Sequence, residues 1–440
     1  MTNPGRLERQ RLPAASRLGA WQLAWLAAAV FVVSAGYGAL MPLLPAWLAP
    51  LMTADGQAEV ARHVGLLSGL YAAGVLVGAP LWGLVSDRWG RGRILVVGLV
   101  GYVASLLPLL RPDSIGLAGI YWSRGATGFF VAAVVPVVPA LVAEHTPQGQ
   151  RARRFAWLGA MSLLGFLFGP GLDTAAAQMA GALAGIGAGT LDTTDLVIVM
   201  SAALGALMML GLAVTLPRTA PAAPQDDVQS VSADRRRAMA LWGLNGAVMF
   251  VLSGFELGIV LQGQQHPALS SREISLMFAQ CSLVMLGVNT LLFFTGLLER
   301  AAGRGVMAAG LVLAIVGLTL LARHRSNAWM YVGVSLTAAG TGLVLPTIAY
   351  LAAGASRLRL GTTMGGLAAA AGFGQTLGSA AAGWLFGAAA QLGFAWLALP
   401  LLATLGTLMV RPTWWPAAQA LPLPPLTAPQ TPSQRNHLEP

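Results

Sequence analysis

Long apolar runs, separated by short charged or turn-forming segments, make up most of the chain. Twelve of these runs are long enough, or nearly so, to cross a hydrocarbon core of roughly 30 Å, which takes about 20 helical residues. We therefore predict helical spans at residues 20–48, 64–86, 94–111, 116–143, 155–178 and 195–216, and then at 239–262, 273–297, 305–323, 328–353, 361–388 and 391–410.

The polar segments divide these spans into two sets. Residues 217–238 hold three prolines and a cluster of charges, so this stretch is predicted to be a linker. Residues 1–19 and 411–440 are predicted to be tails, and the second is rich in proline and expected to be disordered. The predicted fold is an all-α integral membrane protein with two pseudo-symmetric six-helix bundles, at residues 20–216 and 239–410.

The arginines indicate how these spans are oriented. All 26 basic residues are arginines, and 20 of them lie in the tails and in the loops that follow even-numbered spans. Because cytoplasmic loops are enriched in basic residues, both termini are expected in the cytoplasm. We expect a multi-pass protein of the plasma membrane, specifically a bacterial inner membrane. The opposite loops hold only Arg62, Arg111, Arg272, Arg323 and Arg325.

Composition excludes several classes of protein. With 56% hydrophobic and 10% charged residues, the chain lies outside the range of soluble domains. The net charge of +10 comes from short loop patches, so nucleic acid is not an expected partner. Cys281 is the single cysteine, which rules out an intrachain disulfide. We find no phosphate-binding loop, metal-ligand cluster or nucleophile paired with a base, and expect neither an enzyme nor an ATP-driven pump.

A dense group of charges between the second and third spans carries a family resemblance. Residues Gly83 to Arg93 read Gly-Leu-Val-Ser-Asp-Arg-Trp-Gly-Arg-Gly-Arg, and a weaker copy begins at Gly296, about half the chain later. With six plus six spans and a linker, residues 20–410 resemble the major facilitator superfamily. The family turn, Gly-x-x-x-Asp-Arg-x-Gly-Arg-Arg, is matched at Gly83, Asp87, Arg88, Gly90 and Arg91, with Gly92 replacing the last arginine and Arg93 following it.

In that family the turn is a latch that stabilises the outward-facing state. The resemblance implies that Asp87 faces the start of the eleventh span near Gly361, and that Arg91 or Arg93 reaches Glu144. The alternative is that these arginines only set the topology. The second copy of the turn contributes Glu299, Arg300, Gly303 and Arg304.

Two further motifs narrow the resemblance. Arg124 and Gly128 in the fourth span resemble the Arg-x-x-x-Gly pattern of proton-coupled members. Gly165, Gly169 and Pro170 resemble the Gly-x-x-x-Gly-Pro pattern of drug:proton antiporters, which implies close helix packing and a bend. The glycine pair that usually follows is replaced by Asp173 and Thr174.

Three ionisable residues lie deep in predicted spans, namely Arg124, Asp173 and Glu256. Such a residue costs roughly 2.5–3.5 kcal/mol on insertion scales and is a functional candidate by default. Counting residues from the span ends places all three at similar depth in the outer half of the membrane, where one aqueous cavity can hold them. We predict that Glu256, and secondly Asp173, takes up a proton from outside, while Arg124 keeps the carboxylate charged. The alternatives are a frayed helix end for Asp173, helix carbonyls as partners of Arg124, and a structural acid for Glu256.

Other polar or amphipathic residues within spans are candidates to line a substrate cavity. The alternative for each is an interhelical hydrogen bond. These candidates are Tyr37, Tyr71, Asn245, Gln280, Asn289, Tyr350 and Gln375.

The resemblance implies a proton-coupled secondary transporter, specifically an efflux antiporter that exports amphipathic small molecules by alternating access. Its expected partners are a small-molecule substrate, protons and membrane lipid, with no cofactor beyond the proton gradient, and we expect a monomer. Alternatives on the same fold are a dedicated exporter of a metabolite such as a siderophore, or a proton symporter for uptake. A non-transporting membrane sensor is the alternative from a different class.

Overall fold

The computed structural model describes residues 18–48, 57–146, 148–185, 192–216, 233–265, 269–295, 303–323, 326–355 and 360–410. Within these ranges all regular structure is helical and no strand occurs. Each of the twelve predicted spans lies on a helix or on two consecutive helices, so the all-α fold predicted from the apolar runs is confirmed.

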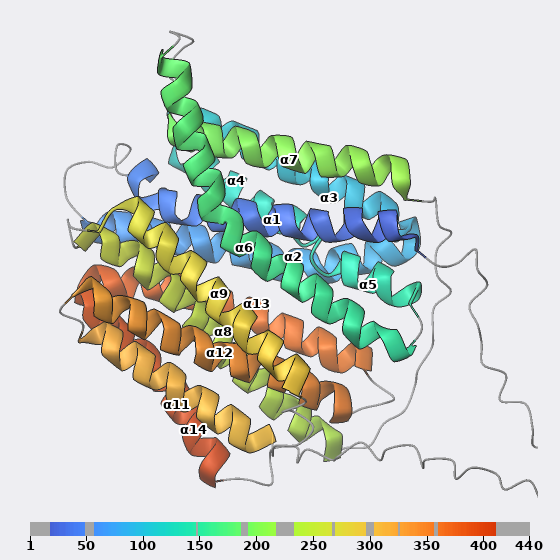
Figure 1. The fold of residues 1–440 in the computed structure, drawn as a ribbon, viewed down its shortest axis with the longest axis vertical. Helices are drawn as coiled ribbons and strands as arrows, with labels where there is room; N and C mark the ends of the chain where they lie inside the picture. Colours follow the sequence, from blue (N-terminus) through green and yellow to red (C-terminus); the bar gives the residue numbers. More distant parts are fainter. Residues whose placement is uncertain are drawn as a thin grey trace, which may run out of the picture.

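The N-terminal helices occupy the upper part of Figure 1, in blue to green. We call them together the N-half. They are α1 (Ala20–Leu48), α2 (Gln57–Trp89), α3 (Arg91–Leu106) with the 3-10 helix η3 (Leu107–Leu110), α4 (Pro112–Val131), α5 (Val137–Glu144), α6 (Gln148–Gly185) and α7 (Thr193–Thr215).

The C-terminal helices, here called the C-half, occupy the lower part of Figure 1, in yellow-green to red. They are α8 (Ala233–Gln265), α9 (Ser271–Thr295), α11 (Gly303–Ala322), α12 (Asn327–Ala355), α13 (Leu360–Ala389), the 3-10 helix η4 (Ala390–Leu392) and α14 (Gly393–Val410). Helix α8 begins at Ala233 rather than at residue 239, so the last residues of the predicted linker are helical. Residues 217–232 and both predicted tails, apart from residues 18–19, lie outside the described residues.

The fourth predicted span is not one continuous helix. It is divided into α4 and α5, and a turn with N–H to carbonyl bonds from Ala133 to Phe130 and from Val134 to Val131 separates them. Pro136 ends this turn. Because proline lacks an N–H and disfavours helical conformation in the preceding residue, the helix breaks here although the apolar run continues.

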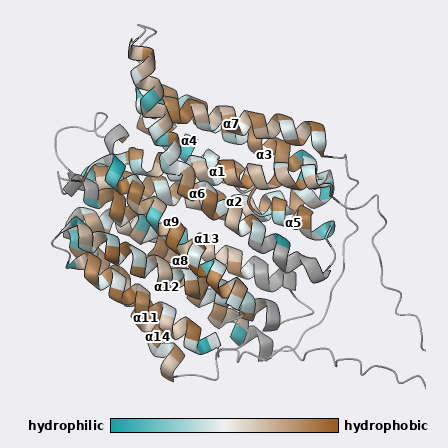
Figure 2. Cartoon of the chain, in the orientation of Figure 1, coloured by the Kyte–Doolittle hydropathy of each residue, from teal (hydrophilic) through white to brown (hydrophobic). Residues whose placement is uncertain are grey.

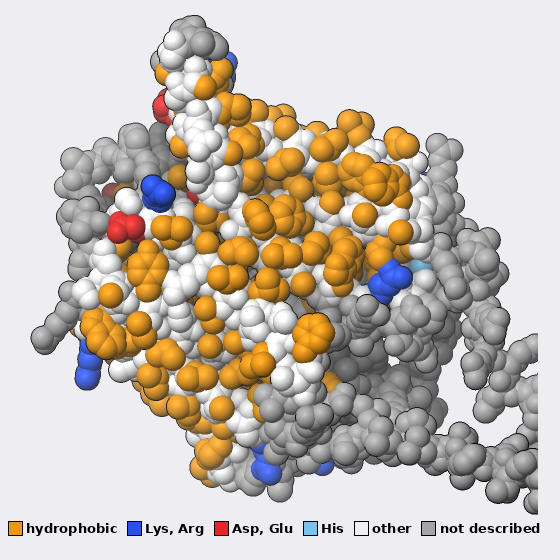
Figure 3. All heavy atoms as spheres, viewed as in Figure 1, with side chains coloured by type: hydrophobic (Ala, Val, Ile, Leu, Met, Phe, Trp, Pro, Cys, Tyr) orange, Lys and Arg blue, Asp and Glu red, His pale blue; other side chains and the backbone are white. Residues whose placement is uncertain are grey.

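The flanks of the molecule are apolar. Ten segments of the described chain are long and apolar enough to cross a membrane, and the last of them contains both α13 and α14. Hydrophobic residues cover the helices along their length, and the charged side chains in view lie toward the helix ends (Figures 2 and 3). Trp122, Phe294 and Val214 are among the most exposed large side chains. Such a surface suits lipid rather than water.

The two halves contact each other through α2 with α13 and through α6 with α9. We call the end of the bundle where α1 ends and α2 begins the far end. There a Cβ atom added to Gly65 of α2 would lie 2.6 Å from the Cα of Gly383 on α13. The two backbones therefore touch, which only small residues permit. At the far end the N-half and the C-half are therefore closed against each other.

Candidate functional site between the two halves

Arg124 is the most deeply buried charge of the site. Its side chain on α4 is 2% exposed, and its Cζ lies 5.1 Å from the centroid of the Tyr71 ring on α2. Its Nε and Nη2 find no hydrogen-bond partner among the described residues. A cation–π contact contributes about 0.5–2 kcal/mol. An unpaired buried charge costs more, about 3–5 kcal/mol. The guanidinium is therefore incompletely compensated by its surroundings.

A row of aromatic rings crosses from the N-half to the C-half. The ring of Tyr37 on α1 lies 5.1 Å from that of Tyr71 and 5.9 Å from that of Phe166 on α6. Phe166 in turn lies 5.6 Å from Phe278 on α9. Aromatic pairs at these separations interact favourably. Tyr37, Tyr71 and Phe166 are half-buried and keep part of their apolar surface uncovered, whereas Phe278 is only 1% exposed.

Glu256 approaches this row from the C-half. It lies half-buried on α8, within electrostatic range of Tyr37 and of Cys281. Tyr37 is also within electrostatic range of Arg124, so the half-buried acid of the C-half and the buried base of the N-half both act on this one ring. No ion pair joins Arg124 to Glu256 or to Asp173 among the described residues. The suggested control of the carboxylate by Arg124 therefore stays a prediction, without a direct ion pair to support it.

Asp173 belongs to the contact between α6 and α9. The hydroxyl of Ser275 donates a hydrogen bond of 3.2 Å to its Oδ2, while Oδ1 is buried without a described partner. Because α6 continues to Gly185, the alternative that Asp173 lies at a frayed helix end is wrong. Nothing in the sequence singled out Ser275, since a serine near a helix end is chemically ordinary.

The three side-chain amides with described contacts among the cavity candidates join helices of the C-half. Asn245 donates to the Leu367 carbonyl at 2.8 Å, and Gln280 donates to the Tyr331 carbonyl at 3.1 Å and to Ser335. Gln375 contacts the Met249 sulfur at 3.8 Å. These contacts match the interhelical alternative. Tyr350 and Asn289 are half-buried, and Tyr350 packs against the core.

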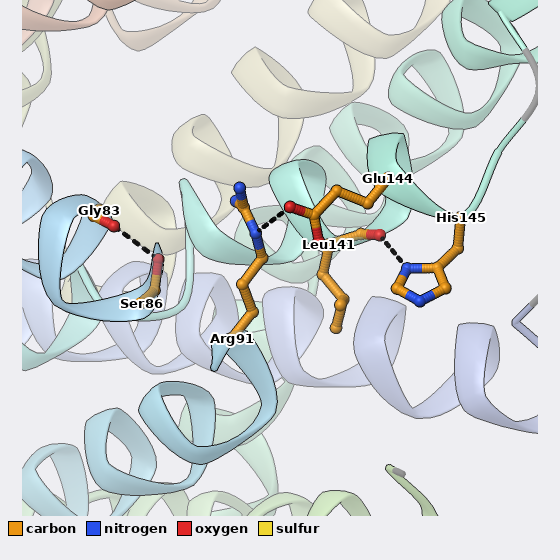
Figure 4. A network of polar contacts seen from close by, with 6 residues as sticks. All are labelled: Gly83, Ser86, Arg91, Leu141, Glu144 and His145. Atoms are coloured by element: carbon orange, nitrogen blue, oxygen red, sulfur yellow. Dashed lines mark hydrogen bonds and ion pairs between the residues drawn. The ribbon is translucent and has the colours of Figure 1, made fainter. Parts of the chain in front are cut away.

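The charged turn after α2 forms one contact that the resemblance implied. Arg91 Nε donates to Glu144 Oε1 at 2.8 Å, and Figure 4 shows the two side chains directed toward each other from α3 and from the end of α5. Gly90, with a φ of 92°, provides the left-handed backbone of the turn, a conformation that glycine adopts without strain. Its role as a latch stays a prediction.

The other members of the predicted latch contribute less to this contact. Arg88 and Arg93 are exposed, and the glycine of the motif at position 83 has no neighbour within 4 Å of an added Cβ. The side chain of Asp87, and therefore its approach to Gly361, lies outside the described residues, as do Glu299 and Arg300. Gly303 and Arg304 begin α11.

The glycines of α6 allow close packing against α1. A Cβ on Gly169 would lie 2.6 Å from the carbonyl carbon of Gly38, and one on Gly165 would collide with the Phe31 carbonyl. Helix α6, with Pro170 inside it, changes direction along its length in Figure 1. The close packing expected of this pattern is present at both glycines.

Comparison with known proteins now identifies the family. The model of the Major Facilitator Superfamily matches residues 26–287, more than half of the chain. The chain belongs to the Major Facilitator Superfamily. Because this is a family of transporters, the expectation that the protein is not an enzyme is confirmed.

Among curated relatives, the class B tetracycline resistance protein of Escherichia coli is 37% identical over 135 residues, which is 31% of this chain and 32% of that protein. The quinolone resistance protein NorA of Staphylococcus aureus is 27% identical over 143 residues, 32% of this chain and 35% of NorA. Each match therefore spans about a third of the relative's own length.

Two solved structures share the fold. The human organic anion transporter MFSD10 (TETRAN) is 19% identical with a TM-score of 0.65, over 88% of this chain and 99% of that one. The xylose transporter XylE from E. coli, in a partially occluded inward-open conformation, is 13% identical with a TM-score of 0.66, over 88% of this chain and 96% of that one. At these identities the likeness shows the fold alone.

Proposed function

We propose that this protein is a proton-coupled secondary transporter that exports amphipathic small molecules by alternating access. The observation that carries the proposal is that Glu256 of the C-half and Arg124 of the N-half are both within electrostatic range of Tyr37. An acid within the membrane where two halves meet is a typical proton carrier of membrane transporters. The relatives named for tetracycline and quinolone resistance support amphipathic drugs as the substrate class.

Glu256 carries the proton in this proposal. A charged carboxylate is costly to enclose between two closing halves, whereas a protonated carboxyl group is not. Proton uptake from one side of the membrane therefore favours one arrangement of the halves, and release on the other side resets it. The half-buried rings of Tyr37, Tyr71 and Phe166 supply the apolar surface for the substrate, and the buried Phe278 packs against Phe166 from the C-half.

The closed far end is one state of the proposed cycle. There Gly65 touches Gly383, and Ser275 donates to Asp173. The distribution of the arginines supports placing both termini in the cytoplasm. The far end then faces outward, and the structure corresponds to a state closed to the outside. We further propose that the transporter works as a monomer in the inner membrane, surrounded by lipid, with the proton gradient as its energy source.

The test uses the purified full chain in liposomes that contain a pH-sensitive dye. A proton gradient is imposed, and tetracycline, norfloxacin, cationic dyes and metal chelators are offered in turn. We expect at least one amphipathic compound to move against its own gradient while protons move the opposite way. Movement of compound and protons in the same direction contradicts antiport, and no coupled movement across the panel contradicts export of amphipathic drugs.

A further inference from the structure

The break between α4 and α5 removes one helical hydrogen bond deep in the N-half. In an α-helix each carbonyl accepts from the N–H four residues later. The Ala132 N–H keeps this pattern and lies 3.1 Å from the Gly128 carbonyl. The Ala133 N–H instead bonds at 3.0 Å to Phe130, so the carbonyl of Phe129 loses its helical donor. Ala133 is fully buried, and an unpaired backbone group is costly in a lipid core.

Trp82 of α2 supplies the missing donor. Its Nε1 donates a hydrogen bond of 2.8 Å to the carbonyl of Phe129. The indole N–H is the only polar group of a tryptophan side chain, so this bond uses the whole hydrogen-bonding capacity of Trp82. The indole ring also lies 5.2 Å from the ring of Phe129 and 6.0 Å from that of Phe130, and these contacts hold it in place.

Glycines of α2 and α3 let the neighbouring backbones approach the break. A Cβ added to Gly78 would lie 2.7 Å from the carbonyl oxygen of Phe129, and one added to Gly98 would lie 2.5 Å from the Cβ of Ala133. Only small residues permit such an approach. The break is therefore closely packed against two helices, which gives it a defined geometry.

A second contact holds the other side of the break. Arg91 at the start of α3 donates at 2.8 Å to Glu144 at the end of α5, as Figure 4 shows. Trp82 and Arg91 lie on either side of the turn that joins α2 to α3. Trp82 holds the end of α4, and Arg91 holds the end of α5. The direction of α5 relative to α4 therefore depends on both contacts.

The Phe129 carbonyl can be satisfied in two ways. The Trp82 N–H satisfies it while the helix is broken, and the Ala133 N–H satisfies it when α4 continues further. Because Pro136 has no N–H, the Ala132 carbonyl lacks a helical donor in both arrangements, and the helix stays bent. Exchange between the two donors therefore changes the bend without abolishing it.

We propose that the break is a hinge of the transport cycle, and that the Trp82 indole N–H holds it in the broken form by taking the place of the Ala133 N–H. Release of this bond lets α5, with Glu144, turn relative to α4. Trp82 is a positioning residue, because it acts through the backbone of α4 and not on the substrate. The role in the cycle rests on the proposed alternating access, whereas the hinge itself does not.

The first test measures the separation of α4 and α5 in the purified full chain in detergent, without substrate or a gradient. Spin labels are attached at Ala118→Cys on α4 and Ala140→Cys on α5, in a Cys281→Ala background, and their separation is measured by pulsed EPR. Trp82→Phe keeps an aromatic ring but removes the N–H. It should change the ratio of two populations of distances by about two- to ten-fold, as the loss of one hydrogen bond implies.

Trp89→Phe is the matched control, because Trp89 lies on the same helix and is 65% exposed. It should leave the distances unchanged. If Trp82→Phe does not fold, Pro136→Ala supplies the missing N–H and should also change the distances, since α4 can then continue through the break. Distances that stay the same in Trp82→Phe, or in Pro136→Ala where only that variant folds, would overturn the hinge.

The second test asks whether the hinge is coupled to the far end. Ala61 is 2% exposed, and its carbonyl would lie 2.7 Å from a Cβ added to Gly383. In an Ala61→Cys, Cys281→Ala background, a water-soluble maleimide should label the protein about two- to ten-fold faster after Trp82→Phe, because the bond that stabilises the closed state is lost. An unchanged labelling rate would overturn the role of the hinge in the cycle. Neither test uses a substrate or a proton gradient, so failure here is distinct from failure of proton-coupled export.

Discussion

Ser275 of α9 donates a hydrogen bond of 3.2 Å to Asp173 of α6, and this bond joins the C-half to the N-half. Alternating access requires the contacts between the halves to break and re-form in each cycle. Asp173 also stands where the antiporter pattern that this chain resembles has a small residue. A change at the Asp173 side chain is therefore expected to alter how readily the far end opens.

The first prediction concerns this bond. Cysteines placed at positions 173 and 275, in a Cys281→Ala background, should cross-link on mild oxidation because the native side-chain oxygens are within 3.2 Å. The cross-link should stop transport, and a reductant should restore it. Mobility shifts on a gel and substrate uptake into liposomes provide the two measurements.

The matched control is a cysteine pair at 174 and 275. Thr174 is exposed and bonds to the Pro170 carbonyl of its own helix, so its side chain points elsewhere. This pair should cross-link poorly. Transport that persists when the 173–275 cross-link is complete would show that the far end does not open.

A second prediction tests the backbone contact between α2 and α13. Gly65→Leu places a side chain where even a Cβ would lie 2.6 Å from Gly383. The far end then cannot close, so transport should fall by about ten-fold or more, as a conformational penalty of about 1.4 kcal/mol implies. Gly159→Leu on α6 is the control, because an added Cβ there meets nothing within 4 Å. Equal transport by Gly65→Leu and Gly159→Leu in liposomes would show that closure at Gly65 and Gly383 is not needed for transport.

A third prediction concerns Arg91 and Glu144, whose side chains are 19% and 32% exposed. Partial exposure screens their attraction, so a double-mutant cycle with Arg91→Gln and Glu144→Gln should give a coupling energy of only about 0.2–1 kcal/mol. If the contact stabilises one state of the cycle, the two substitutions should reduce the transport rate more than they reduce the stability measured by thermal unfolding.

Arg93→Gln serves as the control for this pair. Arg93 is exposed, and no described ion pair involves it. Its replacement should leave transport unchanged. Equal transport by all three single variants would show that the charged turn serves only as a topology signal.

The fold could be predicted from the sequence because apolar runs report directly on helices that cross a lipid core. The break between α4 and α5 was missed, since Pro136 lies within an uninterrupted apolar run. Arg91 and Glu144 were predicted as partners through a family motif, and the structure brings them to 2.8 Å.

The candidate site was harder to predict from the sequence than the fold was. Counting residues from span ends gives the depth of Arg124, Asp173 and Glu256, but not which face of each helix they occupy. In the structure Tyr37 is within electrostatic range of Arg124 and Glu256, and Asp173 accepts a hydrogen bond from Ser275. Which side chains become neighbours depends on how each helix is rotated and packed. These features cannot be derived from a single sequence.

The most direct test of proton coupling is to compare two activities of Glu256→Gln in liposomes. Gradient-driven export needs a group that takes up and releases a proton, whereas exchange of labelled for unlabelled substrate at equal pH does not. We predict that Glu256→Gln loses export but keeps exchange, while Asp113→Asn, which changes an exposed acid on α4, keeps both. Gradient-driven export by Glu256→Gln at the unchanged rate would contradict the assignment of Glu256 as the proton carrier.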